Sequence, residues 1–341
     1  MNRWMPLLAL IAGGCWTTEL PELEPGVLDF APRGAEAPEN WAVQAWPQAD
    51  MLCPDGQLAQ FWLVYPVESA VMLPAAVVFH DNALDYPSDS EAPNISAFRA
   101  ESQLTADHAT LEVFDLMGMG TGSGSGALVA ALAQSGHMVV LPSNCWGDLY
   151  ANGLEQRPND PAVDGFVRRG FDSAEFGFRM VSDEAWATIN RVALPVPIDY
   201  SAPVAIGIGD GGRAVSELLG EEFTVPTAVL DAPLDDVSAY YEQPGTFPNE
   251  AATLDRLFTD VDDANVASLA NTIVAPGRTA YLWSRLDPKI PSGANNGAID
   301  RLNADGAAWI VETGSLEHAP LANDATLAAD VTTWIASAPA E

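Results

Sequence analysis

The first candidate for chemistry is the glycine-rich turn at residues 207–212, which a buried strand is predicted to enter and a helix to leave. Glycines allow the strained backbone of such a turn and let the helix pack close to the strand. A turn of this kind can present one side chain as a nucleophile at the edge of a sheet. The central positions here are Gly209, which has no side chain, and Asp210.

A carboxylate and a histidine follow this turn along the chain. Asp287 comes after the apolar segment 280–283, and His318 comes after the apolar segment 308–311. Their separation of 31 positions leaves room for one helix and one strand. A carboxylate can orient an imidazole and stabilise its charged form. The alternatives are a turn aspartate before a proline for Asp287 and a surface histidine for His318.

The order of elements is typical of a sheet that is covered by helices. Strands are predicted at 60–65, 75–79, 137–141, 204–207, 228–230, 280–283 and 308–311, with helices at 127–134, 213–219 and 323–336 and two more within 161–190. Buried strands that alternate with helices indicate the α/β class, with a mostly parallel central sheet and helices on both faces.

In this context the turn resembles the nucleophile elbow of α/β-hydrolases, especially the dienelactone-hydrolase-like and prolyl-oligopeptidase-like members. Their pattern is Gly-x-Ser-x-Gly-Gly. Gly207, Gly211 and Gly212 match its glycines, and its serine falls on Gly209. The resemblance covers about residues 55–338. It implies Asp287 as the acid and His318 as the base, in the chain order of this fold, and leaves residues 232–275 for a small lid.

The resemblance also implies an oxyanion hole. His80-Asp81 ends a buried strand and is similar to the His-Gly segment that contributes backbone to this hole in many members. Here Asp81 replaces the glycine, and a strand-end turn without function is the alternative. The backbone N–H of Asp210 is the other expected donor, although its carboxylate is unfavourable beside an oxyanion. Ser123 and Ser125, in a glycine-serine loop, are the serines that could act as a displaced nucleophile.

Charge limits the partners. The chain has 47 Asp and Glu against 14 Lys and Arg, a formal net charge of −33, which would repel nucleic acids. No set of His, Cys or acidic residues has the spacing of metal ligands. We therefore expect no metal, no cofactor and no nucleic-acid partner. The resemblance implies a small-molecule ligand or an ester-like substrate instead.

The N-terminus predicts export. A short apolar run ends in Ala-Gly-Gly-Cys at residues 12–15, which resembles a bacterial lipoprotein box. The expected organisation is a signal peptide at 1–14, a lipid on Cys15, an acidic linker at 15–50 and a hydrolase-like domain at 51–341. The protein would lie in the cell envelope, periplasmic or outer-surface, and meet a membrane through this anchor alone. An ordinary signal peptide is the alternative, and Cys53 and Cys145 could form a disulfide.

Two functions remain open from the sequence. One is a degenerate, non-catalytic or impaired relative of serine esterases and peptidases, which binds a small ligand or a partner in the old active-site pocket. The other is an active hydrolase of ester or amide bonds that uses an unconventional nucleophile with Asp287 and His318.

Overall fold

The structure, a computed structural model, describes residues 41–52, 58–67, 69–81, 116–118, 125–142, 176–189, 192, 194–209, 211–220, 225–233, 278–288, 290, 293, 295–305 and 308–337. The strands are β1 (Trp41–Leu52), β2 (Leu58–Pro66), β3 (Leu73–Phe79), β4 (Met138–Pro142), β5 (Ile198–Ile208), β6 (Thr227–Asp231), β7 (Arg278–Trp283) and β8 (Ala308–Glu312). The helices are α3 (Ala127–Gln134), α6 (Glu184–Ile189), α7 (Gly211–Gly220), α12 (Asn296–Asp305) and α13 (Ala325–Ala336), with the 3-10 turn η3 (Pro320–Ala322).

The strands form one eight-stranded sheet in the order β1-β2-β4-β3-β5-β6-β7-β8. β2 pairs antiparallel with both β1 and β4, and the remaining pairs, from β4-β3 to β7-β8, are parallel. The central strands β3, β4, β6 and β7 are buried over nearly their whole length. Their runs of Val, Leu and Ala suit strands that are covered on both faces.

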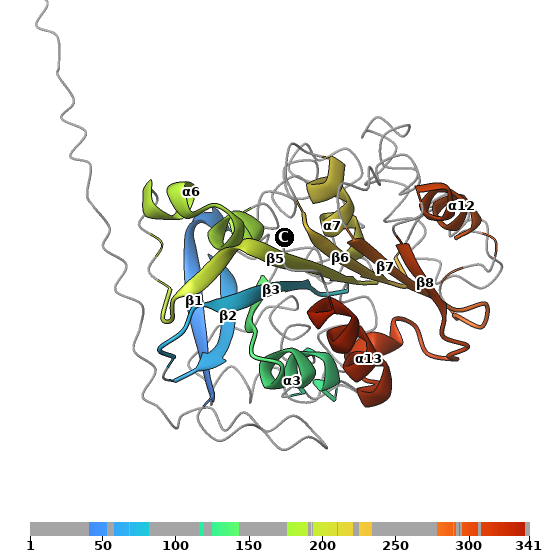
Figure 1. Ribbon diagram of the computed structural model, residues 1–341, viewed down its shortest axis with the longest axis horizontal. Helices are drawn as coiled ribbons and strands as arrows, with labels where there is room; N and C mark the ends of the chain where they lie inside the picture. Colours follow the sequence, from blue (N-terminus) through green and yellow to red (C-terminus); the bar gives the residue numbers. More distant parts are fainter. Residues whose placement is uncertain are drawn as a thin grey trace, which may run out of the picture.

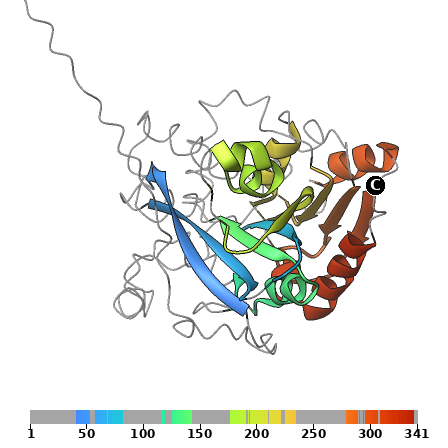
Figure 2. The same cartoon turned by 60° about the vertical axis from the view of Figure 1, so that its left-hand side comes forward.

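Helices cover the two faces of the sheet (Figures 1 and 2). On one face α3 and α13 bury Leu128 and Val331 in one apolar cluster. On the other face α7 and α12 bury Val215 and Leu302 in a second cluster. The prediction of a mostly parallel sheet between two helical layers is therefore confirmed.

The strand order brings several loops together at the carboxyl end of the sheet. After β3 the chain goes to β4 on one side and returns to β5 on the other side of β3. In open α/β sheets a ligand crevice forms at such a switch point, outside the carboxyl ends of the strands. The residues that follow β3, β5, β7 and β8 therefore meet at one edge of the sheet.

The folded part begins earlier than the sequence predicted. Residues 41–50, assigned to the acidic linker, form most of the edge strand β1. Cys15, Cys53, Cys145, Ser123 and Asp210 lie outside the described residues, as does nearly all of the predicted lid at 232–275. Among the helices that the structure describes, none has the length and apolar character needed to cross a membrane.

Candidate functional site

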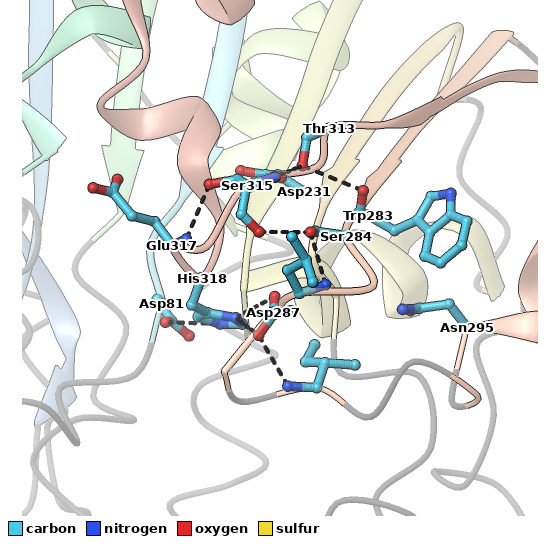
Figure 3. A network of polar contacts seen from close by, with 12 residues as sticks. Asp81, Asp231, Trp283, Ser284, Asp287, Asn295, Thr313, Ser315, Glu317 and His318 are labelled. Atoms are coloured by element: carbon cyan, nitrogen blue, oxygen red, sulfur yellow. Dashed lines mark hydrogen bonds and ion pairs between the residues drawn. The ribbon is translucent and has the colours of Figure 1, made fainter.

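At the carboxyl edge of the sheet, His318 lies between two carboxylates (Figure 3). Its Nδ1 is 3.0 and 3.1 Å from the two carboxylate oxygens of Asp287, and its Nε2 is 3.3 Å from Oδ2 of Asp81. The side chain of Asp287 is 2% exposed, against 17% for Asp81. The predicted pair of Asp287 and His318 is thus brought together, with Asp81 as a third member.

Asp81 also fills the space at the predicted nucleophile position. Gly209 follows β5 with a φ of +53°, a conformation that favours glycine. A Cβ added to Gly209 would lie 2.8 Å from Oδ2 of Asp81 and closer still to Cγ and Oδ1. Real Cβ atoms essentially never approach another atom so closely. The carboxylate from the end of β3 therefore occupies the volume that a side chain at Gly209 would need.

The turn around Gly209 has the tight packing expected of an elbow. The N–H of Gly209 donates to the carbonyl of Asp231, and the N–H of Gly212 donates to the carbonyl of Gly209. A Cβ on Gly211 would collide with the carbonyls of Phe79 and His80. The start of α7 therefore packs directly against the end of β3, which explains how Asp81 reaches Gly209.

Hydrogen bonds tie the loops after β7 and β8 to each other. The hydroxyl of Ser284 donates to the carbonyl of Ser315 over 2.6 Å and accepts from the N–H of Leu286. The N–H of Thr313 donates to the carbonyl of Trp283 over 2.8 Å. Oδ1 of Asp287 also accepts from the N–H of Ile290. These bonds hold the acid loop and the histidine loop in one arrangement (Figure 3).

A third acid, Asp231, lies beneath these loops at the end of β6. Its Oδ2 accepts from the N–H of Leu321 over 2.7 Å, and its Oδ1 has no hydrogen-bond partner among the described residues. Its side chain is fully buried. Burial raises the pKa of Asp231 to about 7, although the Leu321 N–H and His318 act in the opposite direction. Asp287 and Asp81 add smaller upward contributions.

The other predicted residues lie as follows. The ring of His80 is buried, and its Nδ1 contacts the carbonyl of Asp81. The hydroxyl of Ser125 donates to the carbonyl of Asn323, and its N–H donates to the side chain of Asn323. The hydroxyl of Ser125 is thus hydrogen-bonded to the segment between η3 and α13.

Sequence reasoning missed two members of the site. Asp231 and Ser284 carry the contacts that hold the histidine loop, yet neither was singled out. The available signal was their place at the carboxyl ends of two buried strands, where the site was already expected. Within the described parts of the chain, no group of three or more His, Cys, Asp or Glu side chains could hold a metal ion.

Comparisons with solved structures give the fold. No protein-family model matches the sequence, and neither does any curated protein. The structure is similar to inhibited esterase B from Lactobacillus rhamnosis, with a TM-score of 0.56 at 12% identity over 89% of each chain. It is also similar to carboxyl esterase 2 from Tuber melanosporum, with a TM-score of 0.53 at 15% identity over 87% of this chain and 84% of that one.

A third similar structure is the carboxylesterase Cest-2923 from Lactobacillus plantarum, with a TM-score of 0.52 at 12% identity, covering 86% of this chain and 94% of that one. At these identities the likeness shows the fold. The chain has the α/β-hydrolase fold, as the order of its motifs predicted.

Proposed function

We propose that this chain is an exported, lipid-anchored protein that uses a degenerate hydrolase pocket to bind a small ligand or a partner, without forming a serine acyl-enzyme. One observation carries the proposal. The volume at Gly209 that a nucleophilic side chain would need holds the carboxylate of Asp81. Covalent acyl transfer needs a hydroxyl or thiol at the elbow, and glycine supplies none.

The state of His318 supports the same conclusion. A general base must have a ring nitrogen available to take a proton from the attacking group. Here Nδ1 faces Asp287 and Nε2 faces Asp81. The ring nitrogen that would take a proton from a serine therefore lies against the carboxylate of Asp81 instead.

The decisive experiment restores the elbow in two steps. Gly209→Ser alone should stay inactive, because its side chain collides with Asp81. Gly209→Ser combined with Asp81→Gly frees that volume, and we expect hydrolysis of p-nitrophenyl butyrate together with labelling by a fluorophosphonate. Gly209→Ala with Asp81→Gly is the matched control, since it has the space without the hydroxyl. An inactive double variant that still folds would contradict the proposed pocket.

The contact between Asp81 and His318 favours a second candidate, an active hydrolase with an unconventional nucleophile. In that case the unmodified chain hydrolyses short-chain p-nitrophenyl esters, and both Asp81→Asn and His318→Ala abolish the activity. The Asp81 carboxylate is the group at the position where this fold would use a serine. Activity in the unmodified chain that depends on both residues would overturn the binding-only proposal.

Binding can be measured without turnover. Short-chain esters should raise the melting temperature of the unmodified chain, because a ligand that binds only the folded state stabilises it. The lipid anchor has a separate test, which is incorporation of labelled palmitate in a bacterial host. Cys15→Ser should abolish the label and release the protein from the membrane fraction, whereas retention of both would remove the anchor from the proposal.

A further inference from the structure

Two strained residues mark the site. Ala232 and Ala319 have φ values of 46° and 47°, and they are the two non-glycine residues with positive φ among the described residues. Each directly follows a polar residue of the site, Asp231 in one case and His318 in the other. Non-glycine residues keep such conformations only where the surrounding structure holds them. Contacts around Ala232 and Ala319 must therefore hold their backbone in this conformation.

Asp231 contacts both sides of the site. Its backbone carbonyl accepts from the N–H of Gly209 over 2.8 Å. Its Oδ2 accepts from the N–H of Leu321 over 2.7 Å, a bond between residues 90 positions apart. The next residue, Ala232, donates its N–H to the carbonyl of Leu282 at the end of β7. The end of β6, Asp231 with Ala232, is therefore bonded to the turn at Gly209, to strand β7 and to the loop that follows His318.

We propose that Asp231 is the positioning residue of the site, whose carboxyl group holds the strained turn after His318 and thereby keeps the imidazole between Asp81 and Asp287. This inference rests on the proposal that the pocket at His318 is the functional site. The bond from Leu321 closes the turn three residues beyond His318. Without it Ala319 could relax to negative φ, and the ring would leave its two partners.

The role needs a hydrogen-bond acceptor and not a charge. Burial raises the pKa of Asp231 to about 7, so its carboxyl group is protonated through most of the acidic range and still accepts from Leu321. An asparagine side chain supplies the same acceptor in nearly the same shape. Asp231→Asn should therefore keep the site, whereas Asp231→Ala should lose it.

The test follows the imidazole of His318 by NMR in the full chain labelled with ¹⁵N-histidine. The chain has four histidines, so the spectrum of His318→Gln assigns the signals of His318. We expect hydrogen-bonded imidazole N–H signals in the parent and in Asp231→Asn. In Asp231→Ala their exchange with water should become about tenfold faster or more, because the loop opens locally. Unchanged signals in Asp231→Ala would overturn the proposal, as would their loss in Asp231→Asn.

A matched control lies three residues from Leu321. Asp324 also accepts backbone N–H groups through its carboxylate, from Thr326 and Leu327, as the N-cap of α13. Asp324→Ala should lower the melting temperature and leave the His318 signals in place. Loss of those signals in this control would mean that any weakening of the region moves the ring, which overturns a specific role for Asp231.

The unmodified chain gives a second measurement that does not depend on any variant folding. The amide of Leu321 should exchange as slowly as amides of the central strands, because its acceptor is fully buried. Fast exchange would overturn the proposal. These readouts need no ligand and no activity, so their failure is distinguishable from a failure of the proposed function.

Discussion

The two sides of the site differ in how far they keep the arrangement that the fold offers. On the histidine side, which comprises Asp287, His318 and their loops, the two side chains are in contact and the loops are bonded to each other. On the elbow side, which comprises Gly209 and Asp81, the carboxylate of Asp81 fills the space that a side chain at Gly209 would need. The comparison teaches that a bonded pair of an imidazole and a carboxylate can stand beside a position where the space for a further side chain is already filled by Asp81.

Asp231 is bonded to Gly209 on the elbow side and to Leu321 on the histidine side. The pH dependence of the free energy of unfolding tests whether its carboxyl group is buried without charge. In the folded protein Asp231 holds its proton up to about pH 7, whereas the unfolded chain releases it near pH 4. Unfolding therefore frees a proton in this range and becomes easier as the pH rises. We expect Asp231 to cost on the order of 4 kcal/mol of stability between pH 4 and pH 7.

The measurement is urea unfolding at several pH values for the parent and for Asp231→Asn, which cannot ionise. The difference in free energy of unfolding between them should shift in favour of the variant as the pH rises, and should level off above pH 7. A difference that stays constant over this range would show that Asp231 is charged throughout.

Removing the carboxylate of Asp287 should lower the free energy of unfolding more than removing that of Asp81. Asp287 is almost fully buried, contacts His318 and accepts from the N–H of Ile290, so Asp287→Ala removes the acceptor of a buried N–H and one of the two partners of the imidazole. We expect a loss of about 3 kcal/mol in urea denaturation. Asp81 is more exposed, and Asp81→Ala should cost about 1 kcal/mol. Equal losses would mean that the elbow side is as constrained as the histidine side.

The crowding at the elbow can be measured by a double-mutant cycle. Gly209→Ala should cost about 2 kcal/mol in the parent, from the positive φ and from the collision with Asp81. In an Asp81→Gly background only the backbone strain remains, and the cost should fall to about 1 kcal/mol. The same cost in both backgrounds would show that Asp81 does not occupy the space at Gly209.

The bond between the two loops of the histidine side should have the smallest effect. Ser284→Ala removes a buried hydroxyl that bridges Ser315 and Leu286, and we expect a loss of about 1 kcal/mol. Ser69 makes a similar bond to the carbonyl of Val71 in an exposed turn. Ser69→Ala is thus a matched control and should stay within about 0.5 kcal/mol of the parent. Thermal unfolding checks both values.

The elements that were predicted correctly have strong local signals. Runs such as Ala75–Phe79 are apolar and β-branched because both faces of the strand are buried. The pairing of Asp287 with His318 came from the resemblance of their loops to a known family, and the contact between them agrees with strand ends of a parallel sheet meeting at one edge. β1 was missed because Pro47 and acidic neighbours obscure the alternation of Trp41–Trp46, and an edge strand tolerates proline.

The position of Asp81 at Gly209 could not be predicted in the same way. Asp81 and Gly209 are 128 positions apart, and which side chain fills a shared volume depends on how close two strand ends come. The role of Asp231 was hidden for a similar reason. Its partner Leu321 is 90 positions away, and one acid after a short apolar run is common at a turn.

The parallel pairing of β3 with β5 has a consequence for how the chain folds. Val77 pairs with Ala205, so β3 stays open on one side until more than a hundred further residues have been synthesised. Pairing at such separations is slow, because a long loop must close before any contact forms. During that interval the apolar strands β3 and β4 are a hazard for aggregation. A truncated chain that ends before β5 would keep this hazard permanently.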